Sequence, residues 1–328
     1  NKSREENSVC GHKEDMGRAE DMALAAAAGA VAGGIVVAYS MLKWKQRNNE
    51  ESGDVNKESI DVSDFTLLPP PNPDWEPGDK PVSPFRGDFQ SVKIQDMTCA
   101  PYDFFVSAMA PRMFMLCSTL SEDGTKPNLT PVTYIGAVSE DEPHIALGIT
   151  KRKGNPEPKD TQVNIDRTGE FVLNVVSSWC CEAAEHCGKR HGPDVDEFEV
   201  SGFTKIPSVT VRPYRAKETA VQMECRVVKA VDLNDAEGVQ ASRVYIAKVT
   251  AIHFEKELMA PGHDSSRPAI GLPGLKPIAL NNSRQRTCIT QAFSDTKARA
   301  SYEAEFKACG MTLNQLATEG DPQERKES

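Results

Sequence analysis

The chain lacks several features that would assign it at once to a common functional class. Its nine cysteines are odd in number and include no C-x-x-C pair, so a disulfide framework is not indicated and we expect a reducing compartment. Its 38 basic residues are outnumbered by 48 acidic ones, which leaves a net charge of −10. A nucleic-acid-binding protein needs a basic face to displace counterions. We therefore expect no nucleic acid among its partners.

Other motifs are missing as well. No G-x-G-x-x-G run follows a strand pattern, so a Rossmann dinucleotide domain is not indicated. No cysteine stands in a recognisable nucleophile motif, and no repeat of fixed period is present. The apolar fraction is 39%, which is low for a fully globular chain of 328 residues. This composition indicates a compact middle flanked by polar ends that do not pack.

The N-terminal part divides into three segments. Residues 1–21 are polar and mixed in charge, whereas residues 22–42 carry no charge and are long enough for a helix to cross a bilayer. The basic run KWKQR that follows would place the C-terminal side in the cytosol or an equivalent compartment. Because 22–42 is rich in alanine and glycine, a targeting segment and a soluble helix remain alternatives to a membrane tether. Residues 43–96 are acidic and proline-rich, and we expect a linker there.

Short strand patterns begin near residue 97, where the composition changes. Apolar and polar residues alternate in several runs. These runs are separated by turn residues, such as the Asp-Gly of SEDGTKP. We expect strands at about 113–120, 129–138, 144–150, 170–177, 219–233 and 242–255. Few helices intervene, among them one at 159–169. This pattern favours a mainly β domain, a closed barrel over residues 97–290, followed by a C-terminal helix and a disordered tail over 291–328.

One strand of this domain has an unusual composition. Between Lys126 and Glu140 it has no charged residue, yet it is rich in neutral side chains that form hydrogen bonds. These are Asn128, Thr130, Thr133, Tyr134 and Ser139. A core strand would be more apolar, and a strand facing solvent would carry charge. The pattern fits either an ordinary barrel strand, in which threonine and tyrosine serve β propensity, or a strand that faces a ligand.

Three motifs carry a resemblance to a known family. They are CSTLSEDGTKPNLTPVTYIGAVSEDEPHIALGI, PKDTQVNIDRTGEFVLNVVS and DEFEVSGFT, in this order along the chain. Over about residues 100–280 the chain resembles the flavin reductase-like family of FMN-binding split barrels. The resemblance implies a six-stranded antiparallel split β-barrel that binds FMN at the interface of a homodimer. It also implies an oxidoreductase in which NADH or NADPH reduces flavin.

The resemblance also assigns site residues by motif. The flavin ring and ribityl chain would be contacted by Thr119, Asn128, Thr130, Thr133 and Tyr134, with Ser139 at the next turn. The phosphate end would be surrounded by Lys151, Arg152, Lys159, Asp160 and Thr161. Neutral partners suit a flat, largely apolar ring, whereas a phosphate suits cations and the amide groups of a helix N-terminus. The flavin performs the chemistry in such proteins, so no catalytic side chain is named.

Two features bear on function and location. Leu280, in LKPIAL, stands where family members often have the arginine of an Arg-Leu-Gly-Gly run. This departure argues against a nicotinamide contact from the region. It favours the alternative, an FMN-binding module or electron-transfer flavoprotein without its own reductase activity. The sequon Asn128-Leu-Thr130 would be glycosylated only in a secretory lumen. Because Asn128 is expected to contact flavin, we expect the domain to face the cytosol or an organelle matrix.

A dense group of cysteine and histidine residues raises the question of a metal site. The run CCEAAEHCGKRH holds Cys180, Cys181, His186, Cys187 and His191, which are residue types that bind zinc. On a helix Cys180 and Cys187 share a face, but Cys181 points elsewhere and no second pair is present. Buried cysteines usually pack as small apolar residues. We therefore expect no metal.

Overall fold

The structure, a computed structural model, describes residues 62–293 except 77, 86, 98–100, 140–141, 152–156, 193, 261–264, 266–267 and 283–284. In this part of the chain no helix is long and apolar enough to span a bilayer. The candidate span, residues 22–42, lies outside the described residues. So do residues 1–21 and the helix and tail expected near the C-terminus.

The chain divides into two compact units, which are residues 1–85 with 291–328, and residues 86–290. In the first unit, β1 (Thr66–Leu68) pairs in parallel with β14 (Gln291–Phe293). The segment expected to be a linker therefore contains a short strand that pairs with a strand from the other end of the chain.

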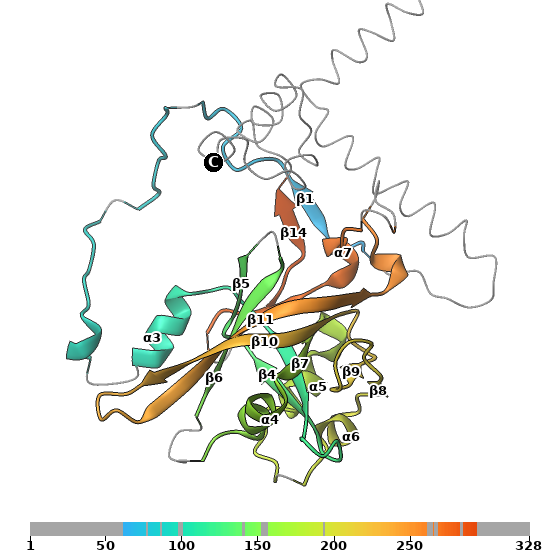
Figure 1. Ribbon diagram of the computed structural model, residues 1–328. Coiled ribbons are helices and arrows are strands. Elements are labelled where there is room, and N and C mark those ends of the chain that lie inside the picture. The colour runs from blue at the N-terminus through green and yellow to red at the C-terminus, as the bar shows by residue number, and fades with distance from the viewer. Residues whose placement is uncertain are drawn as a thin grey trace, which may run out of the picture. The chain divides into compact units, whose positions relative to one another are not determined.

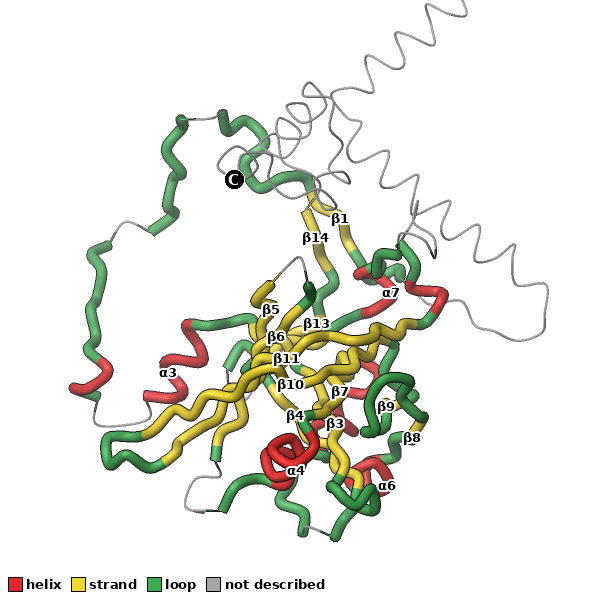
Figure 2. Tube along the Cα trace, viewed as in Figure 1, coloured by secondary structure: helices red, strands yellow, loops and turns green. Residues whose placement is uncertain are grey.

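One antiparallel sheet forms the centre of the second unit (Figures 1 and 2). Its seven strands lie in the order β4-β3-β7-β10-β11-β6-β5. Their bounds are β3 (Met115–Leu120), β4 (Pro127–Val132), β5 (Ile135–Ser139), β6 (His144–Thr150), β7 (Glu170–Val175), β10 (Val221–Asn234) and β11 (Gln240–Phe254). Every neighbouring pair is antiparallel. The expectation of a mainly β domain is thus confirmed.

The two end strands of this sheet, β4 and β5, are separated in sequence by only Thr133 and Tyr134. Because one short stretch of chain supplies both ends of the strand order, the sheet must curl on itself. The Gly148 N–H on β6 donates to the Tyr134 carbonyl at 2.8 Å, and a Cβ at this glycine would lie 3.1 Å from the Tyr134 Cβ. The resemblance implied six strands, whereas the central sheet of the described residues has seven, because the strand over residues 127–139 is interrupted at Thr133 and Tyr134.

Short helices and strands surround the sheet (Figure 2). The helices are η1 (Ile94–Asp96), α3 (Pro101–Ala108), α4 (Asp160–Thr168), η2 (Ser178–Cys180), α5 (Cys181–His186), α6 (Glu197–Ser201), η3 (Lys256–Leu258) and α7 (Leu272–Leu275). The short strands are β2 (Arg112–Met113), β8 (Lys205–Ile206), β9 (Arg215–Ala216), β12 (Ile278–Leu280) and β13 (Arg286–Cys288). The helix α4 contacts β3 and β4, and both α5 and α6 contact β4. Three helices therefore gather around the end strand β4.

A hydrophobic core holds these helices against the sheet. Phe114, Leu116 and Leu129 come from the sheet side, and they pack with Ala184 of α5 and Phe198 of α6. All five are at most 4% exposed. Because burying a large apolar side chain contributes about 1.5–3 kcal/mol, this core fixes the position of α5 and α6 beside β4.

Candidate functional site

A cavity of about 320 Å³ opens beside β4, where this strand meets the start of α4, the turn after α5 and the start of α6. We call it the β4 cavity. It is lined by Asn128, Thr130, Pro131, Lys151, Lys159, Asp160, Thr161, Cys187, Gly188, Lys189, Arg190 and Glu197. Six of these are among the site residues expected from the sequence, namely Asn128, Thr130, Lys151, Lys159, Asp160 and Thr161. The fold therefore brings the expected neutral strand residues and the expected phosphate residues to one place.

Asn128 is the central polar residue of the β4 cavity. Its Oδ1 accepts hydrogen bonds from Thr161 Oγ1 at 2.7 Å and from Thr119 Oγ1 at 3.3 Å. Its Nδ2 donates to Glu197 Oε2 at 3.2 Å. These partners come from β3, α4 and α6 and leave one of the two amide N–H bonds for a ligand. The amide is therefore held in one orientation before any ligand binds.

Thr119 stands behind Asn128 and does not line the β4 cavity. Thr119 is 1% exposed, and its hydroxyl accepts a hydrogen bond from Asn164 Nδ2 at 3.0 Å while donating to Asn128. In this structure Thr119 orients Asn128 from the barrel side. A direct contact between Thr119 and flavin stays a prediction.

A buried carboxylate forms another wall of the cavity. Glu197 is 7% exposed, and its Oε2 accepts from the Leu129 N–H at 3.2 Å as well as from Asn128. Because β4 has a strand partner on one side only, this carboxylate satisfies a backbone donor that no strand pairs with. Burial raises the pKa of Glu197. A raised pKa makes the group easier to protonate when an anionic ligand approaches.

The N-terminus of α4 lies at the cavity. The helix begins at Asp160, and its N-cap residue Lys159 forms no capping hydrogen bond through its side chain. The first N–H groups of a helix lack intrahelical partners and carry partial positive charge, so they favour a phosphate. The helix is tied to β11 through Asp166, which accepts from the Tyr245 hydroxyl at 2.6 Å and pairs with Arg243 at 2.8 Å. The sheet thereby fixes where the helix points.

Three cations at the cavity form no ion pair with any described carboxylate. They are Lys151, Lys189 and Arg190. The turn after α5 brings the latter two to β4 because Gly188 has no side chain. A Cβ at Gly188 would lie 2.9 Å from Cγ of Pro131, a distance that real Cβ contacts do not show. These cations and the helix N-terminus form a positively charged corner suited to a phosphate group.

The other expected site residues lie away from this cavity or outside the described residues. Thr133 accepts a hydrogen bond from Arg112 Nη1 at 2.9 Å, and the Arg112 guanidinium lies 6.0 Å from the ring centre of Tyr134. Burial raises the pKa of Tyr134. Ser139 is exposed on β5, and Arg152 lies outside the described residues. Contacts of these residues with flavin stay predictions.

Sequence reasoning missed three charged residues of the site, namely Lys189, Arg190 and Glu197. Lys189 and Arg190 follow the cysteine-rich helix, and a basic pair after a helix is usually a solvent-exposed feature. Their charge beside a glycine was the available signal. Glu197 lies in the motif DEFEVSGFT, but no local pattern distinguishes it from its exposed neighbour Glu199. Its burial depends on how α6 packs on β4.

The cysteine and histidine group lies on η2, α5 and the turn that follows them. Among the described residues, no group of three or more His, Cys, Asp or Glu side chains could hold a metal ion. Cys180 and Cys187 are 5% and 3% exposed within the hydrophobic core. Burial raises the pKa of Cys187 to about 11, so its thiol is neutral and unreactive near neutral pH. The rings of His186 and His191 lie 5.5 Å apart.

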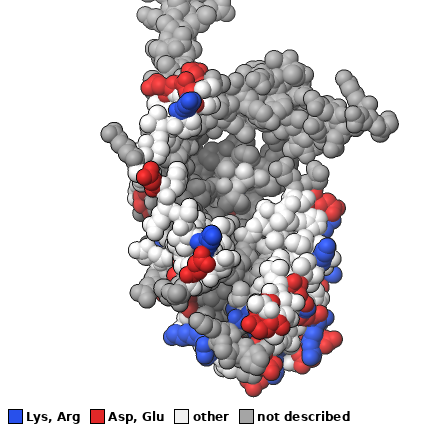
Figure 3. All heavy atoms as spheres, turned by 90° about the vertical axis from the view of Figure 1, so that its left-hand side faces the viewer, with Lys and Arg blue, Asp and Glu red and all other residues white. Residues whose placement is uncertain are grey.

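Charged side chains are mixed over the surface shown in Figure 3. Acidic and basic side chains alternate there, with uncharged surface between them, and neither sign forms a continuous stripe. A nucleic acid backbone is bound by a basic patch or stripe. The described residues of this face do not provide one.

The dimensions of the β4 cavity suit the polar part of FMN. Ligand pockets are typically about 300–1,000 Å³, and this cavity of about 320 Å³ lies at the lower end of that range. A smaller cavity of about 100 Å³ shares Asn128, Asp160 and Glu197 with it. The cations of the β4 cavity fit a phosphate, and its hydroxyl and amide groups fit a ribityl chain.

Known proteins resemble this chain over the barrel domain. The sequence model of the flavin reductase like domain matches residues 108–270. An uncharacterised protein of Aquifex aeolicus is 34% identical over 134 residues, which cover 41% of this chain and 67% of that protein. The chain belongs to the flavin reductase-like family.

Solved structures show that this member of the family shares a known fold. Nitrilotriacetate monooxygenase component B from Bacillus cereus is 24% identical with a TM-score of 0.58, and the match covers 64% of this chain and 100% of that one. A Shewanella frigidimarina protein described as a flavin reductase with a split barrel domain is 20% identical with a TM-score of 0.50, covering 60% and 91%. The fold is therefore of the split-barrel type, and the family places the chain among flavin-related oxidoreductases.

Proposed function

We propose that the protein binds FMN, with the phosphate in the β4 cavity, and that NADH or NADPH reduces the bound flavin. One observation carries this proposal. The neutral pair Asn128–Thr161 lines the same cavity as Lys189 and Arg190, which form no ion pair with a described carboxylate, and as the N-terminus of α4. FMN has an uncharged polyol chain between a flat ring and a phosphate. The neutral groups of the cavity match the polyol chain, and its positive groups match the phosphate.

The chemistry of hydride acceptance would come from the flavin when it is bound. The described residues bind and orient it. Thr161 and Asn128 hold each other in place and present one amide N–H, while Lys151, Lys189 and Arg190 offset the phosphate charge. Glu197 fixes Asn128 from the opposite side. In this arrangement no side chain has to transfer a proton for the hydride step.

Anaerobic mixing tests the proposed reaction. The purified full chain is first titrated with FMN and with riboflavin, and binding is followed by flavin absorbance and fluorescence. NADH and NADPH are then added without oxygen, and we expect the absorbance of the bound flavin to bleach with at least one of them. A protein that ignores FMN contradicts the binding site. Binding without bleaching supports the alternative below.

The alternative is an FMN-binding module or electron-transfer flavoprotein without its own reductase activity. Leu280, which stands where the family often has arginine, is 8% exposed and belongs to the hydrophobic core. Arg286 does not replace that arginine as an available cation, because its Nε pairs with Glu185 Oε1 at 2.5 Å and its guanidinium lies 6.0 Å from the Phe114 ring centre. Arg284 lies outside the described residues. Leu280 and Arg286 therefore do not supply a cation for a nicotinamide phosphate.

A homodimer is part of the proposal. The outer half of the β10–β11 hairpin exposes Val228, Val231, Leu233 and Val239, each at least 40% exposed. The helix α3 exposes Tyr102, Phe104 and Phe105, each at least 47% exposed. Large apolar side chains gathered on the surface mark protein–protein contacts. Light scattering of the full chain at several concentrations is expected to give twice the chain mass, and a monomer at all concentrations would contradict it.

The site also bears on location. Asn128 of the sequon is 8% exposed, and its Nδ2 is hydrogen-bonded to Glu197. A glycan at this atom would break the contact and fill the cavity. We therefore propose a domain that faces the cytosol or an organelle matrix, with a membrane tether through residues 22–42 as the arrangement to test. Fractionation of the full chain and of a chain lacking residues 1–47 tests this, because only the full chain is expected with the membranes.

A further inference from the structure

A second cavity, of about 490 Å³, lies on the β10–β11 side of the barrel. We call it the β10 cavity. Six of its lining residues matter here, namely Arg215, Lys217, Gln222, Ile252, His253 and Glu255. It shares no lining residue with the β4 cavity. The proposed flavin site therefore leaves this cavity without a function.

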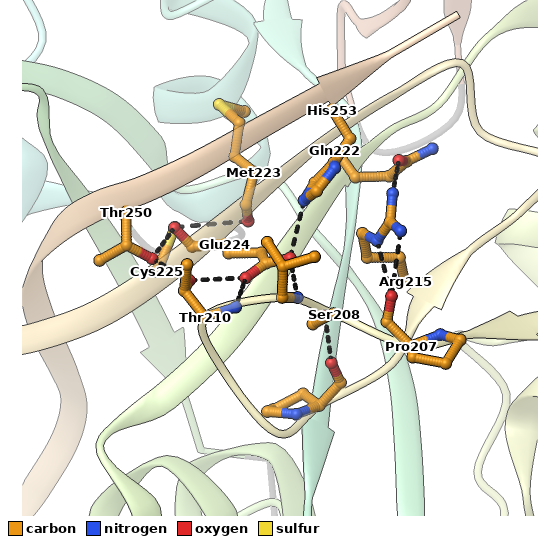
Figure 4. Close-up of polar contacts among 12 residues, drawn as sticks. Pro207, Ser208, Thr210, Arg215, Gln222, Met223, Glu224, Cys225, Thr250 and His253 are labelled. Atoms are coloured by element: carbon orange, nitrogen blue, oxygen red, sulfur yellow. Dashed lines mark hydrogen bonds and ion pairs between the residues drawn. The ribbon is translucent and has the colours of Figure 1, made fainter.

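A buried carboxylate holds His253 at the wall of the β10 cavity (Figure 4). Glu224 is 0% exposed, and its Oε1 accepts from His253 Nε2 and from the Val209 N–H, at 2.7 and 2.8 Å. Its Oε2 accepts from the N–H and the hydroxyl of Thr210, both at 2.6 Å. With two donors on each oxygen, the carboxylate is held in one orientation, and it fixes the position of His253 Nε2.

The second ring nitrogen of His253 points away from Glu224, on the side of Gln222 and Arg215 (Figure 4). His253 and Gln222 are directly paired across β10 and β11. No described residue forms a hydrogen bond with Nδ1. The ring therefore presents one polar atom to the cavity, and Glu224 sets its direction.

Arg215 is the principal cation of the cavity. Its Nε and Nη2 donate to the Pro207 carbonyl at 3.1 and 3.0 Å, and its Nη1 donates to Gln222 Oε1 at 3.3 Å. These acceptors fix the guanidinium but are uncharged, so its positive charge is not neutralised. By contrast, Arg212 and Arg243 pair with carboxylates. Two N–H bonds of Arg215 are not used by these acceptors and suit an oxyanion.

The rest of the lining defines the size and charge of a ligand. Lys217 is exposed and pairs with no described carboxylate, so it adds a second positive charge. Ile252, which is 54% exposed, offers an apolar surface beside these cations. Glu255 is exposed and is the acidic residue of the lining. The combination suits a ligand with one oxyanion group and a small apolar body, rather than a bare ion or a large neutral ring.

We propose that the β10 cavity binds a small organic oxyanion, a carboxylate or a phosphate monoester, which Arg215 and Lys217 hold while Nδ1 of His253 contacts its polar group. This would be a binding site separate from the flavin site. It gives a reason for a fully buried charge on a barrel strand beyond tying down the segment that contains Val209 and Thr210.

The test uses the full chain with one equivalent of FMN, so that the β4 cavity is occupied while little free FMN, itself a phosphate monoester, remains to compete at the β10 cavity. Histidine labelled with ¹³C gives a ring signal for His253, assigned by comparison with His253→Gln. Benzoate, phenyl phosphate and inorganic phosphate are titrated, with neutral benzamide as the control. We expect the His253 signal to shift with benzoate or phenyl phosphate and not with benzamide. If only inorganic phosphate moves it, if no anion moves it, or if benzamide moves it equally, the proposal is wrong.

Charge variants separate binding from a merely structural role. We expect Arg215→Gln to weaken anion binding about tenfold and Lys217→Gln about threefold. The partly buried Arg215 should contribute more than the exposed Lys217, because solvent screens an exposed charge. Glu255→Gln should strengthen binding about threefold, since it removes the one carboxylate of the lining. Lys229→Gln, on an exposed part of β10, is the matched control and should change nothing. A structural role predicts no opposite effects from Lys217→Gln and Glu255→Gln, so equal anion affinities in these two variants would overturn the proposal.

Discussion

Glu197 and Glu224 are both buried in the same unit of the protein, yet their carboxyl groups are shifted in opposite directions. Burial raises the pKa of Glu197, which accepts two hydrogen bonds at 3.2 Å through one oxygen. Burial also acts to raise the pKa of Glu224, but donors from Thr210, Val209 and His253 outweigh it and lower the pKa to about 2. The number and distance of donors therefore decide the charge of a buried carboxyl group.

The two cavities differ accordingly. In the β10 cavity a permanent buried charge fixes a ring on adjacent barrel strands. In the β4 cavity neutral amide and hydroxyl groups set the geometry, and the charge comes from a turn and a helix end at the periphery. The wall of the β10 cavity is therefore rigid, whereas the β4 cavity leaves room for a ligand whose negative charge balances the cations.

The largest expected effect is on folding. Glu224→Gln places an NH₂ group where one carboxylate oxygen accepts two hydrogen bonds, so buried donors lose their acceptor. We expect the free energy of unfolding at pH 7 to fall by about 2–4 kcal/mol. Urea denaturation followed by circular dichroism measures this. Glu197→Gln is the control and should lose far less, because an amide oxygen still accepts from Asn128 and Leu129. Equal losses in the two variants would break the comparison.

Acid should reveal the same difference. Because the pKa of Glu224 is about 2 in the folded protein and 4.5 is its ordinary value, the unfolded chain binds more protons between these limits. The stability contributed by the ionised group is therefore present above about pH 4.5 and is lost as the pH falls toward 2, by about 3 kcal/mol in total. Asp123 and Asp232 also have pKa values of about 2, so the quantity to measure is the difference between the wild type and Glu224→Gln. That difference should shrink with falling pH, and a constant difference would contradict it.

Loss of the cations at the β4 cavity should act on the phosphate alone. The double variant Lys189→Gln, Arg190→Gln is expected to weaken FMN binding about 10–100-fold, because it removes charge-assisted contacts. Riboflavin, which has no phosphate, should bind almost as well as to the wild type. Fluorescence titration measures both affinities, with Lys229→Gln as the control on an exposed strand. A matching loss for riboflavin would show that the turn supports the ring instead.

A smaller effect is expected where only orientation is lost. Thr161→Val keeps the shape of the side chain but removes the donor to Asn128 Oδ1. We expect FMN affinity to fall about 3–10-fold, the worth of one neutral hydrogen bond. Thr161→Ser retains the hydroxyl and should restore most of the affinity. Failure of serine to do so would indicate that the methyl group, and not the hydrogen bond, matters.

The smallest effect concerns the charge of Glu197. Since the pKa of Glu197 is raised, its carboxyl group ionises at a higher pH than an ordinary glutamate does. The charge that then forms repels a phosphate. We expect FMN affinity to fall with rising pH in that window. Glu197→Gln should remove this pH dependence and bind FMN about two- to threefold more tightly at the upper end. An unchanged pH profile in the variant would show that another group titrates.

The helix over residues 159–169 and the neutral strand after Lys126 illustrate how far the sequence leads. The helix was found within one residue at its start, at Asp160, because its pattern and the terminating Gly169 are local signals. The neutral run was found because a lack of charge over many residues is visible without a structure. Thr119 and Thr133 show the limit, since strand alternation does not reveal which threonine faces the cavity and which faces Asn128 or Arg112.

The residue pattern predicts a mainly β domain, because strand alternation and helix ends are properties of neighbouring residues. The resemblance of the motifs to the flavin reductase-like family predicts half of the residues that line the β4 cavity. The fold decides the rest. Lys189 and Arg190 reach β4 only through the close approach at Gly188, and Glu224 stays ionised only because donors from a distant segment converge on it. Charge, burial and direction of a side chain depend on neighbours that lie far away in sequence, and only tertiary packing supplies them.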